Sequence, residues 1–386
     1  MAAFIASLGK ANVRFSSRTA SRSRVVCSAS LETEQGLILR GKSLEVEGEP
    51  ALGSRVSGPI LNRYIRDDGE EWMIHWTFRP DSGFDEKVVP GATTGYIGAG
   101  FSNDGIAWDV SKAALKPNTE DWWYFDTVHC CVGDVQLLSS DVIRSDGSVY
   151  FMYFHGGDDE IVTVGSDEVK GYRTRIGVAV SLDGRHWSRI EGEHANGSIL
   201  DVGEEGCFDA EFVASPQVIK LGSEYRMYYH SYDRKTGLYG VGLAISSTGL
   251  EFKRVQNGPI RFQGEDNAFF AKGVSSRHVI QKRDGTFEMF FEGVSESEEH
   301  SICRAMSADG ISWDVPRSSP ILTKGEASDW DGGGVGKPRV VVMDDQSIRL
   351  YYTGWDSESS STAIGLAVSD GTDWNNLVRY SEEVRM

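Results

Sequence analysis

One short sequence pattern recurs five times along this chain of 386 residues. Each copy is an alternating apolar run that leads into a tight turn, often Asp-Gly, and then into an aromatic residue, as in Ile176–Trp187. Self-similarity at a regular spacing is the signature of repeat architectures, so five equivalent structural units are expected. The closing aromatics of the copies are Trp108, Trp187, Phe252, Trp313 and Trp374.

Each unit contains enough strand signals for a four-stranded sheet. An aromatic, β-prone run precedes every copy, as at Tyr150–Phe154 and Tyr225–Tyr229, and a further turn and apolar strand precede most of these runs. Asp-Gly is typical of hairpin turns that require positive φ, and the aromatic after it can pack across the hairpin. A unit is therefore strand, turn, strand, loop, strand, turn, strand, which is the blade of a propeller.

The sequence predicts an all-β chain, a five-bladed β-propeller of four-stranded antiparallel blades. We expect residues 36–52 to form a leading strand that closes or caps the ring, because an open sheet edge is a liability. The expected blades span about residues 53–115, 126–195, 203–258, 264–320 and 325–380.

The N-terminus has a composition of its own. Residues 1–30 hold five basic residues, many Ser and no acid. Arg- and Ser-rich, acid-poor N-termini are typical of organelle transit peptides. We expect residues 1–30 to be a chloroplast transit peptide cleaved near Cys27, with the propeller at 31–386 in the stroma. A mitochondrial address and a merely disordered N-terminus remain the alternatives.

Charge and apolar content exclude some function classes. The formal net charge of the chain is −18. Since the first thirty residues contribute +5, the remainder carries −18 − 5 = −23. An acidic body argues against a nucleic-acid partner, because phosphate backbones need a basic footprint. There is no uninterrupted apolar run of about 18 residues, so no transmembrane helix is expected.

Cysteine usage gives no sign of a metal centre. The body of the chain holds Cys130, Cys131, Cys207 and Cys303 without CxxC spacing, so a zinc site is not expected. Cys130 and Cys131 are adjacent and would face opposite sides of a strand. Buried structural thiols are the default interpretation, and thioredoxin-linked redox control is the alternative. We expect no metal and no cofactor.

The repeat resembles a known group of propellers. Each repeat combines an aromatic run, such as Tyr225–Tyr229, with a pattern such as Ile-Gly-Leu-Ala at Ile364–Ala367. This combination resembles the repeats of the superfamily of arabinanases, levansucrases and invertases, and most closely those of relatives of glycoside hydrolase families 43 and 32. The resemblance covers nearly the whole chain after residue 30. It implies a site where three carboxylates converge at one mouth of the central channel, and a carbohydrate or sugar-phosphate ligand.

The chain departs from that family pattern at a decisive place. The family carries an Asp just before a Pro in the innermost strand of blade one, where this chain has Ser57-Gly58-Pro59. The family's Glu-Gly-Pro-like acid motif is also missing. The catalytic set therefore cannot be carried over residue by residue.

Acidic residues at the blade entrances are the first candidates for a rebuilt site. Asp209 and Glu211 are two positions apart, and on a strand they would share a face, where mutual repulsion would raise one pKa. Such a pair suits glycosidic cleavage, and a solvated acidic face is the alternative. Asp126, Asp266 and Asp331 recur at equivalent places, where each could bind substrate or tie a loop through backbone N–H groups.

The ends of the second strands and the innermost strands supply further candidates. The aligned second-strand ends are Thr77, His155, His230, Glu292 and Thr353. The innermost strands carry Lys272, Arg277 and Lys337, which would bind phosphate if they faced the channel. Trp355 could stack on a sugar ring or pack as core. The candidate catalytic residues are thus Asp209, Glu211 and Glu292, and the candidate substrate-binding residues are Asp126, His155, His230, Lys272, Arg277, Asp331, Lys337 and Trp355.

Three functions follow from these patterns. The first is a glycoside hydrolase-like enzyme that acts on an oligosaccharide or sugar derivative through the Asp209–Glu211 pair. The second is a catalytically inactive propeller that serves as a sugar-binding or protein-assembly platform, which the missing Asp before Pro59 favours. The third is a phosphate-dependent glycoside phosphorylase.

Overall fold

The structure is a computed structural model, and the expected transit peptide (1–30, with Cys27) and Asp266 lie outside the residues that it describes. The described residues are 34–41, 44–46, 49–53, 55–66, 69–81, 87–89, 94–138, 149–164, 166–263, 268–317, 319–358 and 361–381.

Five antiparallel four-stranded sheets follow one another along the chain. They are β4 (Arg55–Arg66), β5 (Gly69–Arg79), β6 (Tyr96–Ser102) and β7 (Asp109–Val110) in blade 1; β8 (His129–Leu138), β9 (Val149–Gly157), β12 (Arg175–Ser181) and β13 (Ser188–Ile190) in blade 2; β14 (Ala214–Leu221), β15 (Glu224–Asp233), β16 (Leu238–Ser246) and β17 (Lys253–Arg254) in blade 3; β19 (Gly273–Gln281), β20 (Phe287–Val294), β21 (His300–Ser307) and β22 (Ser312–Asp314) in blade 4; and β23 (Gly334–Val342), β24 (Ile348–Trp355), β25 (Thr362–Asp370) and β26 (Asp373–Arg379) in blade 5.

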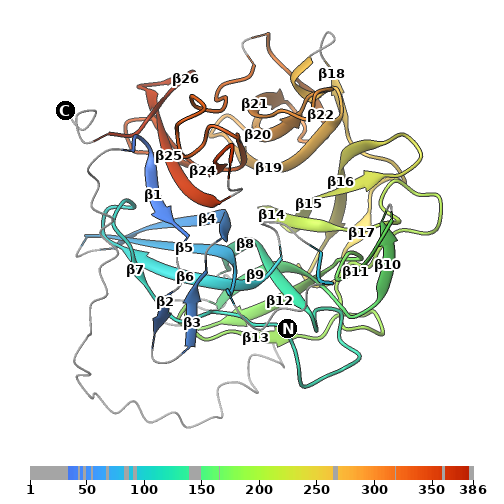
Figure 1. Cartoon of the computed structure of the whole chain (residues 1–386). Coiled ribbons are helices and arrows are strands. Elements are labelled where there is room, and N and C mark those ends of the chain that lie inside the picture. Colours follow the sequence, from blue (N-terminus) through green and yellow to red (C-terminus); the bar gives the residue numbers. More distant parts are fainter. Residues whose placement is uncertain are drawn as a thin grey trace.

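The innermost strands form a closed ring. β4 contacts β8, β8 contacts β14, β14 contacts β19, β19 contacts β23, and β23 contacts β4 again. Figure 1 shows the five sheets arranged around this centre, in chain order. The prediction of a five-bladed propeller is confirmed.

The leading segment joins the last blade. β1 (Leu37–Arg40) pairs antiparallel with β25, beside β26, and β25 makes a parallel bridge from Thr362 to Arg55 of β4. The N-terminal end of the described chain is thereby tied to the last blade, which holds the ring shut. Short additions are the hairpins β2 (Leu44–Val46) with β3 (Glu49–Leu52) and β10 (Ile161–Val164) with β11 (Asp167–Lys170), the strand β18 (Arg261–Gln263) and the 3-10 helix η1 (Ala268–Phe270).

The core lies between blades rather than within one layer. Neighbouring residues of β9 face opposite boundaries: Met152 packs towards blade 1, while Tyr153 packs towards blade 3. Both faces of the second strands are therefore buried, which explains their uninterrupted apolar and aromatic runs. One hydrophobic cluster fills each of the five boundaries.

The recurring turn is stabilised by its own side chains. Ser102 Oγ accepts the N–H of Gly105, and Asp104 Oδ1 accepts the N–H groups of Ile106 and Ala107. Gly105 has φ of 75°, a conformation that favours glycine. The same bonds recur at Ser181 and at Ser307.

These turns also connect neighbouring blades. Tyr153 of blade 2 donates to the carbonyl of Gly249 in blade 3 at 3.0 Å, and Tyr228 donates to Gly310 of blade 4 at 2.7 Å. Tyr351 closes the ring by donating to Gly105 of blade 1 at 2.9 Å. The glycine of the turn thus presents its carbonyl to a tyrosine of the preceding blade, in addition to its role in reversing the chain.

No helix among the described residues has the length and apolar character needed to cross a membrane.

Candidate functional site

The mouth is the end of the ring at which the innermost strands begin. Close to this end, every innermost strand has a register shift, where an extra residue is inserted opposite the second strand. Ser215 and Lys337 occupy two of these bulges with φ of 46° and 48°. Left-handed backbone is costly for residues other than glycine and clusters at functional sites, so the bulges identify the mouth as the place to examine.

Near their ends, four of the five second strands are hydrogen-bonded to the innermost strand of the next blade and so act as clamps. Thr77 Oγ1 accepts the N–H of Val132, and Thr353 Oγ1 accepts the N–H of Gly58 at 2.9 Å. His155 Nδ1 accepts the N–H of Ser215 at 3.2 Å. Their alignment in the sequence therefore reflects a structural role in satisfying the backbone of the bulges.

Glu292 follows the same rule and His230 does not. Glu292 Oε2 accepts the N–H of Lys337 at 3.0 Å. His230 Nδ1 is buried and has no hydrogen-bond partner among the described residues. His230 is the exception in the ring of clamps, and its imidazole has an unused polar atom.

The mouth brings together a set of predicted residues that we call the axial cluster: His155, His230, Arg277, Glu292 and Lys337. His155 is affected by the charges of Lys337, His230 and Arg277. His230 is affected by the charges of Arg277, Glu292 and Lys337. The five side chains are therefore neighbours. Burial lowers the pKa of His155 well below its usual value and that of His230 to about 3. Both imidazoles are neutral at physiological pH.

Lys337 contributes a positive charge at the centre of the mouth. Its Nζ donates to Ser57 Oγ at 3.2 Å, and its stem passes Gly58, the residue beside Pro59. Burial lowers the pKa of Lys337, although Cys131 and Glu292 act in the opposite direction. The lysine of blade 5 thus contacts the segment Ser57-Gly58-Pro59, where the resemblance noted from the sequence led us to expect an Asp.

Arg277 is the most deeply buried cation of the cluster. It is 6% exposed, and its Nη2 donates to the carbonyl groups of Ser215 and Tyr228. Its Nε and Nη1 are buried without a partner among the described residues. Burial lowers the pKa of Arg277 to about 9, with Asp134 opposing. Unpaired buried donors of a cation are expensive, and an anion would satisfy them.

A buried ion pair lies in the same innermost strands, beyond the bulges. Asp134 Oδ1 contacts Arg339 Nη1 at 2.9 Å, and its Oδ2 accepts the N–H of Val218. Asp134 and Arg339 are 0% and 6% exposed. This pair links blades 2, 3 and 5, and it leaves the charge of Arg277 without a carboxylate of its own.

Glu292 connects the cluster to a histidine that the sequence analysis did not select. His300 Nδ1 lies 2.7 Å from Glu292 Oε1. His300 begins β21, and its ring meets the indole of Trp355 edge-on at 5.3 Å between centroids. Only the eight-residue spacing to Glu292 across the β20–β21 hairpin could have suggested it, and hairpin spacing is not a signal of chemistry.

Three candidate aspartates lie inside blades instead of at the mouth. Asp126, Asp209 and Asp331 are at most 1% exposed, and each pairs with an arginine of the outermost strand of its own blade. The Nη2–Oδ2 contact of Arg189 with Asp126 is 2.6 Å; the Nε–Oδ2 contacts of Arg254 with Asp209 and of Arg379 with Asp331 are 2.7 and 2.8 Å. Tyr229 and Tyr352 donate to the last two. Burial raises the pKa of Asp126 to about 7, while Arg189 opposes this shift. These aspartates fasten the loop before each blade to its outer edge.

The expected strand geometry of Asp209 and Glu211 is wrong. Residues 205–211 form turns and bends, and β14 begins only at Ala214. Glu211 forms an ion pair with Arg234 at 2.8 Å and acts electrostatically on Tyr172, whereas Asp209 faces Arg254. The two carboxylates therefore have separate partners and do not form a convergent pair.

Two other candidates also lie away from the expected positions. Lys272 precedes β19 and pairs with the exposed Glu298 at 2.9 Å, so it does not face the axial cluster. Trp355 packs so closely on Gly333 and Gly334 that a Cβ on Gly334 would lie 2.2 Å from its ring. One face of this indole is therefore covered by backbone.

The cysteines are buried or half-buried free thiols among the described residues. Cys130 packs in the cluster between blades 1 and 2, while Cys131 Sγ lies 3.6 Å from His129 Nδ1, so the two do face opposite sides. Burial raises the pKa of Cys131 and of Cys303 to about 12. Within the described part of the chain, no group of His, Cys, Asp or Glu is arranged to hold a metal ion.

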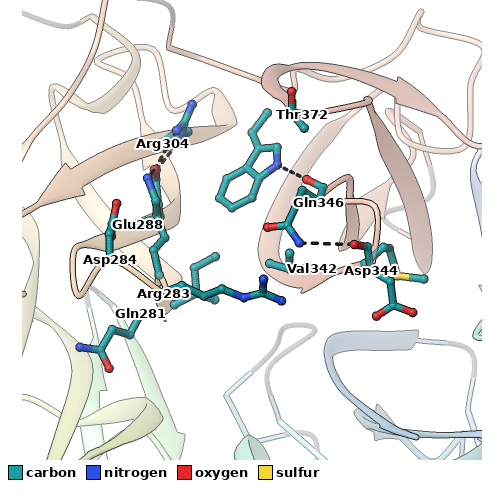
Figure 2. A pocket seen from close by; sticks show the side chains of 13 residues that line it. Gln281, Arg283, Asp284, Glu288, Arg304, Val342, Asp344, Gln346 and Thr372 are labelled. Atoms are coloured by element: carbon teal, nitrogen blue, oxygen red, sulfur yellow. Dashed lines mark hydrogen bonds and ion pairs between the residues drawn. The ribbon is translucent and has the colours of Figure 1, made fainter.

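A cleft of about 570 Å³ lies on the face opposite the mouth, between the turns of blades 4 and 5. Glu288 and Arg304 form its floor as an ion pair at 2.7 Å, and Figure 2 shows Arg283 extending across it towards the turn that carries Asp344. Glu288 is 1% exposed and also contacts Lys282, and Asp344 pairs with Arg63. The buried charge of the cleft is thus already neutralised, in contrast to Arg277 at the mouth.

Comparisons with known proteins address the fold. No family model matches the sequence, and no curated protein matches it. Among solved structures, one described as a glycoside hydrolase superposes with a TM-score of 0.61 at 15% identity, over 87% of this chain and 92% of that one. A thermostable family-43 glycoside hydrolase gives 0.59 at 13%, over 85% and 95% of the two chains.

A third neighbour comes from a study of family 130. It belongs to work on this family of mannoside phosphorylases, which contains glycoside hydrolases that target β-1,2 mannosidic linkages in Candida mannan. It superposes with a TM-score of 0.57 at 14% identity, over 88% of this chain and 95% of that one. At such identities the likeness concerns the fold: this chain has the five-bladed propeller fold of glycoside hydrolases.

Proposed function

We propose that the chain binds the phosphate group of a phosphorylated sugar at the mouth of its propeller. The observation that carries the proposal is Arg277, a buried cation whose Nε and Nη1 lack partners, next to His230 with its unused Nδ1 and to Lys337. Phosphate oxygens accept several hydrogen bonds at once, which is what this arrangement lacks.

The electrostatics of the axial cluster support an anionic ligand. Burial lowers the pKa of both Lys337 and Arg277, which means that their charged forms are destabilised in the ligand-free protein. A bound anion would stabilise both charges in a site of low dielectric, where such interactions are strong.

The rim beside His230 suits a sugar ring. Phe212 meets the ring of His230 edge-on at 5.7 Å, and Tyr172 meets Phe212 at 5.9 Å. Phe212 and Tyr172 are half-buried and present apolar surface next to the polar cluster. Ligand sites commonly combine an aromatic wall with a few well-placed polar groups.

The separation of the acidic candidates favours binding over hydrolysis by the predicted pair. Asp209 is bonded to Arg254 and Tyr229, and Glu211 to Arg234. Glycosidic cleavage by two carboxylates needs them about 5 to 10 Å apart across the scissile bond, with one free to donate a proton. Neither residue is free in this way.

The test is ligand-induced thermal stabilisation with a panel of inorganic phosphate, sugar phosphates and the corresponding unphosphorylated sugars. A phosphorylated ligand at a hundredfold excess over its dissociation constant should stabilise the wild type by about 2.7 kcal/mol, and Lys337→Ala should reduce this stabilisation. Lys253→Ala, an exposed lysine on β17, is the matched control for loss of charge. Stabilisation by neutral sugars alone would contradict the proposal, as would glycosidase turnover that disappears in Glu211→Gln.

A further inference from the structure

The dyad of Glu292 and His300 lies at the edge of the axial cluster and has a geometry that fixes the role of its imidazole. One oxygen of Glu292 accepts the backbone N–H of Lys337 and the other contacts His300 Nδ1 at 2.7 Å. A single carboxylate therefore separates the imidazole from the lysine at the centre of the mouth. Both oxygens are occupied, which holds the ring of His300 in one orientation.

The second nitrogen of His300 is free. Its side chain is 30% exposed, Nδ1 is engaged by Glu292, and Nε2 has no hydrogen-bond partner among the described residues. Trp355, backed by Gly333 and Gly334, fixes the ring from the side. A protonated His300 consequently presents one N–H to whatever occupies the mouth.

The charge balance of the mouth depends on this proton. Asp134 and Arg339 neutralise each other, and His155 and His230 are neutral. With a neutral His300, Lys337 and Arg277 oppose Glu292 and leave an excess of one positive charge. With a protonated His300 the excess is two, which matches a doubly charged anion.

We propose that His300, oriented by Glu292, determines the charge specificity of the mouth. When protonated, it raises the net excess of positive charge from one to two, and the mouth then selects a dianion over a monoanion. The inference rests on the proposed function and names its ligand more narrowly, as a phosphate monoester and not a diester or a carboxylate. Opposite charges in a partly buried site favour each other's ionised form, so the dianion is bound together with a proton.

The groups that face His300 are Glu292 from β20, Glu298 and the indole of Trp355 from β24. Burial lowers the pKa of His300, but the hydrogen bond and charge of Glu292 and the charge of Glu298 outweigh it, so the pKa is raised. Glu298 is itself paired with Lys272. The carboxylate of Glu292 is therefore the main group that favours the protonated form of His300.

The experiment uses two probes whose own charge does not change with pH. Sulfate is a tetrahedral dianion and dimethyl phosphate a monoanion throughout pH 6 to 8, and both are titrated calorimetrically in buffers of different ionisation enthalpy. In the wild type, sulfate should bind with proton uptake and weaken as pH rises. His300→Gln should weaken sulfate by about tenfold at pH 6 and abolish the proton uptake, and it should weaken dimethyl phosphate distinctly less, so that the preference for the dianion falls.

A second variant separates the role of the dyad from simple loss of the ring. Glu292→Gln keeps an oxygen for the N–H of Lys337 but removes the charge that raises the pKa of His300, so the pH at which sulfate binding weakens should fall. Because this change also removes a negative charge from the mouth, sulfate should bind at least as tightly as in the wild type, and the pH dependence is the readout. If sulfate binds both variants with the pH profile of the wild type, the inference is overturned and the proposed function stands. If the wild type binds neither sulfate nor any sugar phosphate, the proposed function itself is overturned.

Discussion

Glu292 and Lys337 join two blades at the centre of the propeller, since Glu292 Oε2 accepts the backbone N–H of Lys337 at 3.0 Å. The acceptor lies near the end of the second strand of blade 4, and the donor occupies a left-handed bulge in the innermost strand of blade 5. The same carboxylate orients His300. A contact that joins two neighbouring blades thus also arranges the charged groups of the mouth.

The space around Glu292 is set by a glycine. A Cβ on Gly336 would lie 2.6 Å from the carboxylate of Glu292, so Gly336→Ala must displace it. We expect a loss of roughly 1–3 kcal/mol in the free energy of unfolding, as for an overpacked core, together with weaker phosphate binding. Denaturant unfolding measures the first and calorimetry the second.

Gly258→Ala is the matched control, because a Cβ there meets open space and the backbone is not left-handed. Gly258→Ala should change neither the free energy of unfolding nor the affinity for phosphate. If Gly336→Ala also behaves as the wild type, the carboxylate is not held as described.

The aspartate–arginine pairs inside the blades should prove structural. Asp331 is 0% exposed and bonded to Arg379 and Tyr352, so Asp331→Asn leaves a partly buried guanidinium without its counter-charge. Breaking such a pair should cost about 3 kcal/mol of stability. Sugar-phosphate affinity of the folded variant should equal that of the wild type. If the variant has normal stability but does not bind the ligand, Asp331 is a binding residue and not a structural one.

The blades could be predicted from the sequence because their signals are local. The turn and the closing aromatic are close in the sequence, as Ser102 and Trp108 are, and the aromatic strand precedes them within the same blade. The turn also satisfies its own backbone, as Ser102 and Asp104 do. That a leading segment would cover an edge was predictable. The strand that does so is only Leu37–Arg40, however, and a separate hairpin of β2 and β3 follows it. Periodicity alone thus determined the architecture.

The site could be predicted only in part, because its contacts cross blade boundaries. His155, His230, Glu292, Arg277 and Lys337 were found through their aligned positions, but what they bond to was not. Asp331 and Arg379 are 48 residues apart, and Lys337 and Ser57 are 280 apart, without a local signal for either pairing. Asp209 and Glu211 were misplaced because their two-residue spacing implies a shared face only on a strand, and the chain turns there.

Stability should depend on pH through His300. Its folded-state pKa is raised, chiefly by Glu292 acting against burial, so the dyad stabilises the fold fully below the unfolded pKa of about 6.5. This contribution is lost as pH rises through the folded-state pKa. The difference in unfolding free energy between the wild type and His300→Gln should therefore shrink as pH increases from 6 towards 9. A difference that grows with pH would contradict the sign of the shift.

The clamps at the ends of the second strands can be tested without touching a charge. Thr353 is 2% exposed, and its Oγ1 accepts the N–H of Gly58 at 2.9 Å. Thr353→Val keeps the shape of the side chain but leaves that backbone donor unsatisfied, which should cost about 1–3 kcal/mol. Thr372→Val, at an exposed threonine in the β25–β26 turn, is the matched control and should be nearly neutral. Because Gly58 lies beside the stem of Lys337, the buried variant should also bind phosphate more weakly. Equal unfolding free energies for the two variants would show that the bulges do not depend on these clamps.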